Sequence, residues 1–195
     1  LFPGRFPRRQ LLSNASTTAI SISNILSVVR PTERRDTLHS AGDFYGLDGV
    51  PGSRGVWTRD EGRYDRDRYV FGACGGAAAY RRSMLDQIGL FDGGLVAYVE
   101  DVDLNLRAQA AGHRCVFAPR ARVYHRLSAT GGGPLASYYC GRNFIIVLAR
   151  DLPGALLRRH WPKVVRAHVR QPDVQVVEVP DGRVGRQADG GHADS

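Results

Sequence analysis

The chain has 195 residues, 43% of them hydrophobic and 24% charged, a composition that supports one or at most two globular domains. Its net charge is +8, but the basic residues gather in residues 1–35 and 150–170 and leave the middle of the chain nearly neutral. Because no zinc-finger spacing, helix-turn-helix pattern or aromatic RNA-binding motif accompanies these charges, the sequence argues against a nucleic-acid binder.

Composition divides the chain into four segments. Residues 1–36 are Arg-rich and divergent, and they include a Ser/Thr/Ile-rich stretch to which the sequence assigns no structure. Residues 37–153 carry dense patterning, and residues 154–171 are a basic segment with helical character. Residues 172–195 are rich in Gly, Asp and Val without periodicity, so we expect a disordered tail there.

The patterned segment alternates between strands and helices. Gly-rich residues 42–62 are predicted to form a loop. The later elements follow in order: a buried strand at 69–74, a short helix at 81–88, a helix at 101–111, strands at 115–118 and 122–125, and a helix at 137–149. Interleaved strands and helices indicate a protein of the α/β class.

Three widely spaced cysteines, Cys74, Cys115 and Cys140, form no CxxC metal pair and no even-numbered disulfide framework. They predict reduced, mostly buried thiols in a cytoplasmic protein. The first residues lack the pattern of a signal peptide, and the apolar run at 15–29 is too short and polar to span a bilayer. We expect a protein that is soluble or peripheral to a membrane.

The helix at 101–111 begins with three acids, Glu100, Asp101 and Asp103, and carries apolar residues on two sides, which predicts a helix embedded between layers. Asp103 lies four residues before Arg107, so these two side chains are expected to pair along one face. Asp101 has no basic partner at helical spacing. It is either the helix N-cap or a carboxylate that faces a cavity, where it could accept a proton from a hydroxyl.

Residues 73–79 are almost all small, and Ala73, Cys74, Gly75 and Gly76 open the stretch. Small side chains let the backbone approach a ligand or another element closely. Two substrates could meet on such a surface without bulky side chains blocking their approach.

The order of these motifs resembles glycosyltransferase family 2, especially its bacterial rhamnosyltransferase-like members. The resemblance covers about residues 37–153 and rests on six stretches: 40–43, 72–82, 89–92, 100–104, 125–131 and 142–143. It implies a partial GT-A fold, the C-terminal acceptor-side half without the N-terminal Rossmann-like half. The implied activity is inverting transfer of a sugar from a nucleotide-diphosphate donor to a hydroxyl of a polysaccharide or lipid-linked glycan.

The resemblance also implies roles for individual residues. Asp101 corresponds to the catalytic base and Glu100 to its neighbour, while Ala73, Cys74, Gly75 and Gly76 correspond to the floor under the donor sugar and the acceptor. His125 corresponds to a position near the metal, Mn²⁺ or Mg²⁺, although a lone histidine is also an ordinary surface or core residue. Thr130 and Gly131 correspond to a diphosphate-binding loop, although a Gly run is also an ordinary mobile loop.

Three questions stay open in the sequence. Arg142 could neutralise the leaving diphosphate or bond backbone carbonyls of a neighbouring loop. The chain as a whole could be an active transferase or a non-catalytic remnant that binds an acceptor or partner and lacks the donor-binding half. Basic residues 158–170 are either a solvated helix face or a surface for peripheral association with the inner face of an anionic cell membrane.

Overall fold

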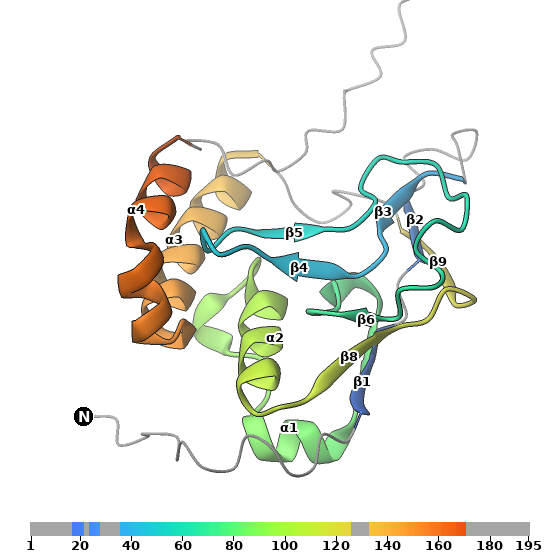
Figure 1. Ribbon diagram of the computed structural model, residues 1–195, viewed down its shortest axis with the longest axis horizontal. Coiled ribbons are helices and arrows are strands. Elements are labelled where there is room, and N and C mark those ends of the chain that lie inside the picture. Colours follow the sequence, from blue (N-terminus) through green and yellow to red (C-terminus); the bar gives the residue numbers. More distant parts are fainter. Residues whose placement is uncertain (1–16, 22–23, 28–35, 126–132, 171–195) are drawn as a thin grey trace, which may run out of the picture.

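The computed structural model describes residues 17–21, 24–27, 36–125 and 133–170 and shows mixed strands and helices, as expected for the α/β class (Figure 1). The strands are β1 (Thr17–Ser21), β2 (Asn24–Ser27), β3 (Leu38–Ser40), β4 (Asp43–Tyr45), β5 (Pro51–Ser53), β6 (Tyr69–Val70), β7 (Ala78–Tyr80), β8 (Arg114–Phe117) and β9 (Arg122–His125). The helices are α1 (Arg82–Ile88), α2 (Glu100–Ala110), α3 (Gly133–Asp151) and α4 (Gly154–Arg170), with short 3-10 turns at Gly75–Ala77 and Gly93–Leu95.

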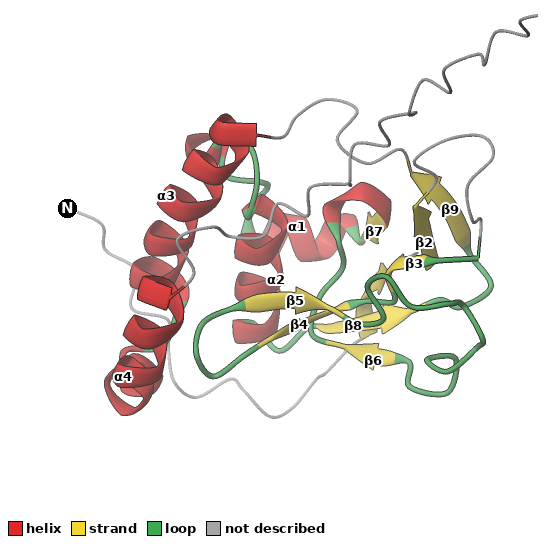
Figure 2. Cartoon of the chain, turned by 90° about the horizontal axis from the view of Figure 1, so that it is seen from above, coloured by secondary structure: helices red, strands yellow, loops and turns green. Residues whose placement is uncertain are grey.

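The strands form two sheets and a hairpin. One sheet has the order β6-β8-β1-β7, with β1 parallel to β8 and antiparallel to β7. The second has the order β3-β2-β9, with β2 parallel to β9. The strands β4 and β5 pair as an antiparallel hairpin. Both views place α3 beside α4 at one end of the molecule and the two sheets toward the other, with α2 and the β4–β5 hairpin between them (Figures 1 and 2).

Two expectations about strands need correction, and one stretch that the sequence left unassigned proves to contain strands. The strand expected at 69–74 is only Tyr69–Val70, and Tyr69 is exposed because β6 lies at the edge of its sheet. Beyond it the chain bonds to β4 instead, since the Phe71 amide donates to the Asp43 carbonyl. The loop expected at 42–62 contains the β4–β5 hairpin. The stretch before residue 36 supplies β1 and β2, each an interior strand of its sheet.

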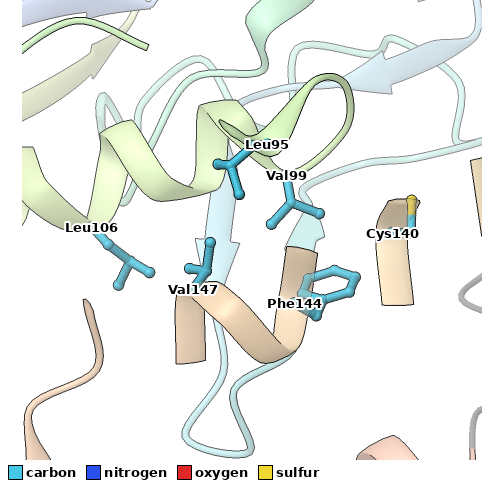
Figure 3. Packing of buried hydrophobic residues seen from close by; sticks show 6 residues of the cluster. All are labelled: Leu95, Val99, Leu106, Cys140, Phe144 and Val147. Atoms are coloured by element: carbon cyan, nitrogen blue, oxygen red, sulfur yellow. The ribbon is translucent and has the colours of Figure 1, made fainter. Parts of the chain in front are cut away.

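The helix α2 is embedded between two apolar clusters, as its two apolar faces predicted. Leu106 packs in a cluster with Phe144 and Val147 of α3 (Figure 3). Ala108, two residues further on, packs with Met84 of α1 and other residues of a second cluster. This double burial fixes the position of α2, and therefore the position of the acids in its first turn.

Two further expectations concern the cysteines and the possibility of a membrane span. Cys74, Cys115 and Cys140 are free, and the last two are buried, as the sequence predicted. Among the helices that the structure describes, none is both long and apolar enough to cross a membrane.

Candidate functional site

The acidic run sits at a strained turn that leads into α2. Val96, Tyr98 and Val99 adopt positive φ angles of 64°, 65° and 68°, a region that β-branched and bulky residues rarely occupy. Val99 is the residue that caps α2. Asp101 therefore lies inside the first turn, and the interpretation of Asp101 as the N-cap is wrong.

Asn143 of α3 holds this turn in place. Its side chain is fully buried, and its amide nitrogen lies 2.7, 2.9 and 2.8 Å from the carbonyl oxygens of Leu95, Ala97 and Tyr98. Strained backbone persists when the surrounding structure over-determines it, and these bonds do so here. Asn143 belongs to one of the stretches that carry the resemblance, but the sequence indicates no role for it, because its acceptors lie 45–48 residues away.

Asp101 lies directly against the small-residue stretch. The amide of Gly75 donates to Asp101 Oδ2 at 2.8 Å, and the amide of Val102 donates to Oδ1 at 2.8 Å. A Cβ atom on Gly75 would approach the Asp101 carboxylate at 3.5 Å and Glu100 Oε1 at 3.7 Å. The structure thus brings together the two motifs that the sequence singled out, and it leaves an exposed glycine surface beside the carboxylate.

Asn105 fixes the other end of the small-residue stretch. Its side chain is nearly fully buried and bonds both the amide and the carbonyl of Ala73, at 3.3 and 3.0 Å. Gly72 packs so closely on Asn105 that a Cβ atom would overlap its side chain. The backbone of residues 72–75 is therefore tied to α2 at Asn105 and Asp101, one helical turn apart.

A third acid, Asp43, joins the site from β4. One oxygen each from Asp43 and Asp101, together with the sulfur of Cys74, lie within 4.8 Å of one another. Ser40 and Ser53 donate hydroxyl hydrogen bonds to Asp43 Oδ1 at 3.0 and 2.7 Å. Asp43 lies in the stretch 40–43, which is part of the resemblance. Nothing in the sequence shows that β4 brings it to Cys74 and Asp101, which follow it by 31 and 58 positions.

The pKa values of these groups are all raised, which favours their protonated forms. Burial raises the pKa of Asp43 to about 7, with a further contribution from the Asp101 charge. Burial also raises the pKa of Asp101, although the backbone amides oppose this shift, and raises that of Glu100. Burial is the main cause that raises the pKa of the Cys74 thiol to about 12, so this thiol stays neutral. The site favours uptake of a proton.

The remaining acid of the run, Asp103, is structural, as its spacing predicted. It is fully buried, and its Oδ2 accepts from Arg107 Nε and Nη2 at 3.1 and 2.6 Å. Its Oδ1 accepts from Arg150 of α3, which also pairs with Asp92 at 2.5 Å. Asp103 thus ties α2 to α3 and to the turn before α2.

Arg142 takes one of its two expected roles in this structure. Its Nη1 donates to the Gly94 carbonyl at 3.1 Å and to Asn143 Oδ1 at 2.7 Å, so it bonds a loop carbonyl beside the strained turn. Thr130 and Gly131 lie outside the described residues.

His125, the expected metal ligand, ends β9. Its ring lies 6.5 Å from that of His39 of β3, and its buried Nδ1 has no hydrogen-bond partner among the described residues. Among the described residues, His125 belongs to no group of three metal-ligating side chains close enough to share an ion. The described residues therefore do not form a complete metal site at His125.

Comparison with known proteins gives two curated relatives, and no family model or solved structure matches the chain. Both are named N-acetylglucosaminyl-diphospho-decaprenol L-rhamnosyltransferase, from the CDC 1551 and H37Rv strains of Mycobacterium tuberculosis. Each is 34% identical over 173 aligned residues, gaps included, and the match covers 80% of this chain and 56% of the relative. The chain thus spans about half the length of the curated relatives it matches. The similarity supports a relationship with rhamnosyltransferase-like glycosyltransferases.

Proposed function

We propose that this chain carries the catalytic base of an inverting GT-A glycosyltransferase, which transfers a sugar from a nucleotide-diphosphate donor to a glycan hydroxyl. The observation that carries the proposal is the contact of Asp101 with the Gly75 amide. This contact puts the Asp101 carboxylate beside an exposed surface of small residues. Among the described residues the carboxylate has no basic partner. The similarity to the two rhamnosyltransferases supports the same reaction class.

The chemistry follows from the position of Asp101. An acceptor hydroxyl bound over Gly75 and Gly76 donates its hydrogen bond to the carboxylate, which takes the proton as the oxygen attacks the anomeric carbon. The bond from that carbon to the diphosphate breaks on the opposite side, so the configuration inverts. Two backbone amides fix the carboxylate, and burial makes it a stronger base by raising its pKa.

The small residues serve the same reaction by leaving room. In-line attack requires acceptor oxygen, anomeric carbon and leaving group in one line, and side chains on Gly75 or Gly76 would occupy that space. Glu100, next to Asp101, is proposed as a supporting acid. Its Oε1 lies 3.7 Å from the position that a Cβ atom on Gly75 would take, beside the surface proposed for the acceptor.

The substrate class is also a proposal. The two relatives are named for transfer of L-rhamnose to N-acetylglucosaminyl-diphospho-decaprenol. We propose a lipid-linked glycan acceptor of this type and a role in bacterial cell wall or polysaccharide biosynthesis. Leaving-group stabilisation by Thr130, Gly131 and Arg142, and a requirement for Mn²⁺ or Mg²⁺ near His125, are further proposals.

A lipid-linked acceptor is confined to a membrane, and α4 offers a surface that suits one. Four exposed basic residues lie on it without an acid in the helix: Arg158, Arg159, Lys163 and Arg166. Trp161 is 56% exposed on the same helix, and tryptophan is favoured at membrane interfaces. We propose that this helix holds the protein peripherally at the inner face of an anionic cell membrane.

Vesicle sedimentation tests the membrane proposal. Replacing Arg159, Lys163 and Arg166 by Gln should reduce binding to vesicles rich in anionic lipid by about 100-fold, at about 1 kcal/mol per basic residue. Replacing the three exposed arginines of a loop, Arg63, Arg66 and Arg68, removes the same charge elsewhere and should have a smaller effect. Equal losses for the two triple variants would contradict the proposal.

Calorimetry and turnover together test the transferase. The purified chain is titrated with a nucleoside-diphosphate sugar, with and without Mn²⁺, and then assayed for transfer to a lipid-linked acceptor. The proposal predicts binding in both wild type and Asp101→Asn, but turnover only in wild type. A lack of binding at millimolar donor would favour the non-catalytic remnant, and heat that does not depend on Mn²⁺ would argue against the metal.

A further inference from the structure

The carboxyl group of Asp43 is the strongest feature that the proposed reaction does not use. Its position is built rather than incidental. Its backbone bonds that of Gly72, with the Asp43 amide donating to the Gly72 carbonyl at 2.9 Å, so β4 is fixed to the start of the small-residue stretch. The hydroxyls of Ser40 and Ser53 both donate to Oδ1. This arrangement orients the carboxyl group and places it within 4.8 Å of the Asp101 carboxylate.

The charges around Asp43 are mostly of its own sign. The groups that influence it or share its surroundings come from every neighbouring element: Ser40, Ser53, Arg54, Cys74, Tyr80, Glu100 and Asp101. Arg54 is the only cation in this set, and it donates to the Ala41 carbonyl and to Asp67. Two partly buried carboxylates at this separation disfavour double ionisation, so the site favours either a proton or a cation.

A proton fits the site better than a cation. Both oxygens of Asp101 already accept backbone amides, and Asp43 Oδ1 accepts two hydroxyls. The Cys74 thiol keeps its own proton at neutral pH. Hard divalent ions need about six oxygen ligands, and the group of three described side chains supplies two carboxylates and a thiol. Asp43 Oδ2 accepts no hydrogen bond from the described residues, which leaves it able to carry a proton.

We propose that Asp43 is a positioning residue for Asp101: the two carboxyl groups interact through their charges and titrate as a pair that holds one proton, and the Asp43 charge strengthens Asp101 as a base. Loss of this proton to water leaves two adjacent negative charges. When Asp101 then takes the proton of the acceptor hydroxyl, their repulsion is relieved. The hydroxyl oxygen forms its bond to the anomeric carbon, and the diphosphate leaves with the electron pair of the broken bond. This inference rests on the proposed transferase function.

The first test is the pH profile of kcat/KM for the full chain. In wild type kcat/KM should increase as the pH rises through an apparent pKa of about 7, which gives the profile a rising limb. Asp43→Asn removes the like charge and should move this limb to lower pH by about one unit or more, with a lower maximum because the base is weaker. Ser53→Ala removes the 2.7 Å bond that favours ionised Asp43 and should move the limb to higher pH.

Opposite shifts separate a coupled pair from a merely structural residue. Asp65→Asn, which makes the same charge change on an exposed loop, should leave the profile unchanged. If Asp43→Asn and Ser53→Ala both lower the rate without moving the limb, the proposal is wrong. If Asp43→Asn does not fold by circular dichroism, the Ser53→Ala shift alone decides the question.

The second test needs no turnover. In protein labelled with ¹³C at the aspartate carboxyl carbons, one resonance should titrate near pH 7, disappear in Asp43→Asn and titrate at lower pH in Asp101→Asn. If this titration is observed but the chain has no transfer activity, the proposal of a coupled Asp43–Asp101 pair stands and the proposed transferase function is wrong. Transfer that depends on Asp101, without this titration, would refute the pair alone. Selective broadening of both resonances by micromolar Mn²⁺ would show a cation in place of the proton and also refute it.

Discussion

Replacement of Asp103 by Asn should unfold the protein at a lower temperature without touching the chemistry. The carboxylate is fully buried and accepts hydrogen bonds from both Arg107 and Arg150. Removing one member of a buried ion pair costs about 3–5 kcal/mol. Here Arg107 keeps a bond to the Ile88 carbonyl and Arg150 is 41% exposed, so about 2–4 kcal/mol is expected. That loss corresponds to a fall in Tm of about 5–15 °C.

The chain contains a matched control for this prediction. Arg82 and Asp86 form an Arg–Asp pair of the same spacing on α1, but their side chains are 85% and 58% exposed. Asp86→Asn should therefore cost less than about 1 kcal/mol. Thermal unfolding followed by circular dichroism compares the two variants. Equal losses in Asp103→Asn and Asp86→Asn would show that burial of the pair is not what stabilises the contact of α2 with α3.

Three further predictions concern the small-residue stretch and Asp43. Gly72→Ala should cost about 1–3 kcal/mol in urea unfolding, because its Cβ atom overlaps the buried Asn105 side chain; unchanged stability would contradict the packing. Gly75→Ala should fold normally, since its Cβ atom meets Asp101 at van der Waals distance, yet slow transfer about tenfold or more by crowding the acceptor; an unchanged rate would argue against an acceptor there. Because the pKa of Asp43 is raised in the folded state, the free energy of unfolding of wild type should fall relative to Asp43→Asn as the pH rises from about 4 to about 7. Parallel curves of unfolding free energy against pH for the two proteins would refute that shift.

The local parts of this structure could be predicted from sequence. The helix expected at 101–111 is observed as Glu100–Ala110, because its first turn is acidic, Gly112 follows its end and its apolar residues fall on two faces. The Asp103–Arg107 pair follows from the same helical spacing. In both cases the information lies within one or two helical turns of chain.

The parts that could not be predicted depend on contacts between distant residues. Strands β1 and β2 lack the alternation of a half-buried strand, and their partners β8 and β9 lie about a hundred residues later. Asp43 reaches Asp101 only through the bonds of β4 to Gly72, and Asn143 caps a turn that precedes it by more than forty residues. Spacing rules for helices and strands carry no information about such pairings.

The most direct test of the account is the rate of sugar transfer by Asp101→Asn, compared with wild type under single-turnover conditions and saturating donor. The exchange keeps the size of the side chain and removes its ability to accept a proton, so the rate should fall by about 100-fold or more while donor affinity stays within about twofold. Transfer by Asp101→Asn at more than about a tenth of the wild-type rate would show that Asp101 is not the base.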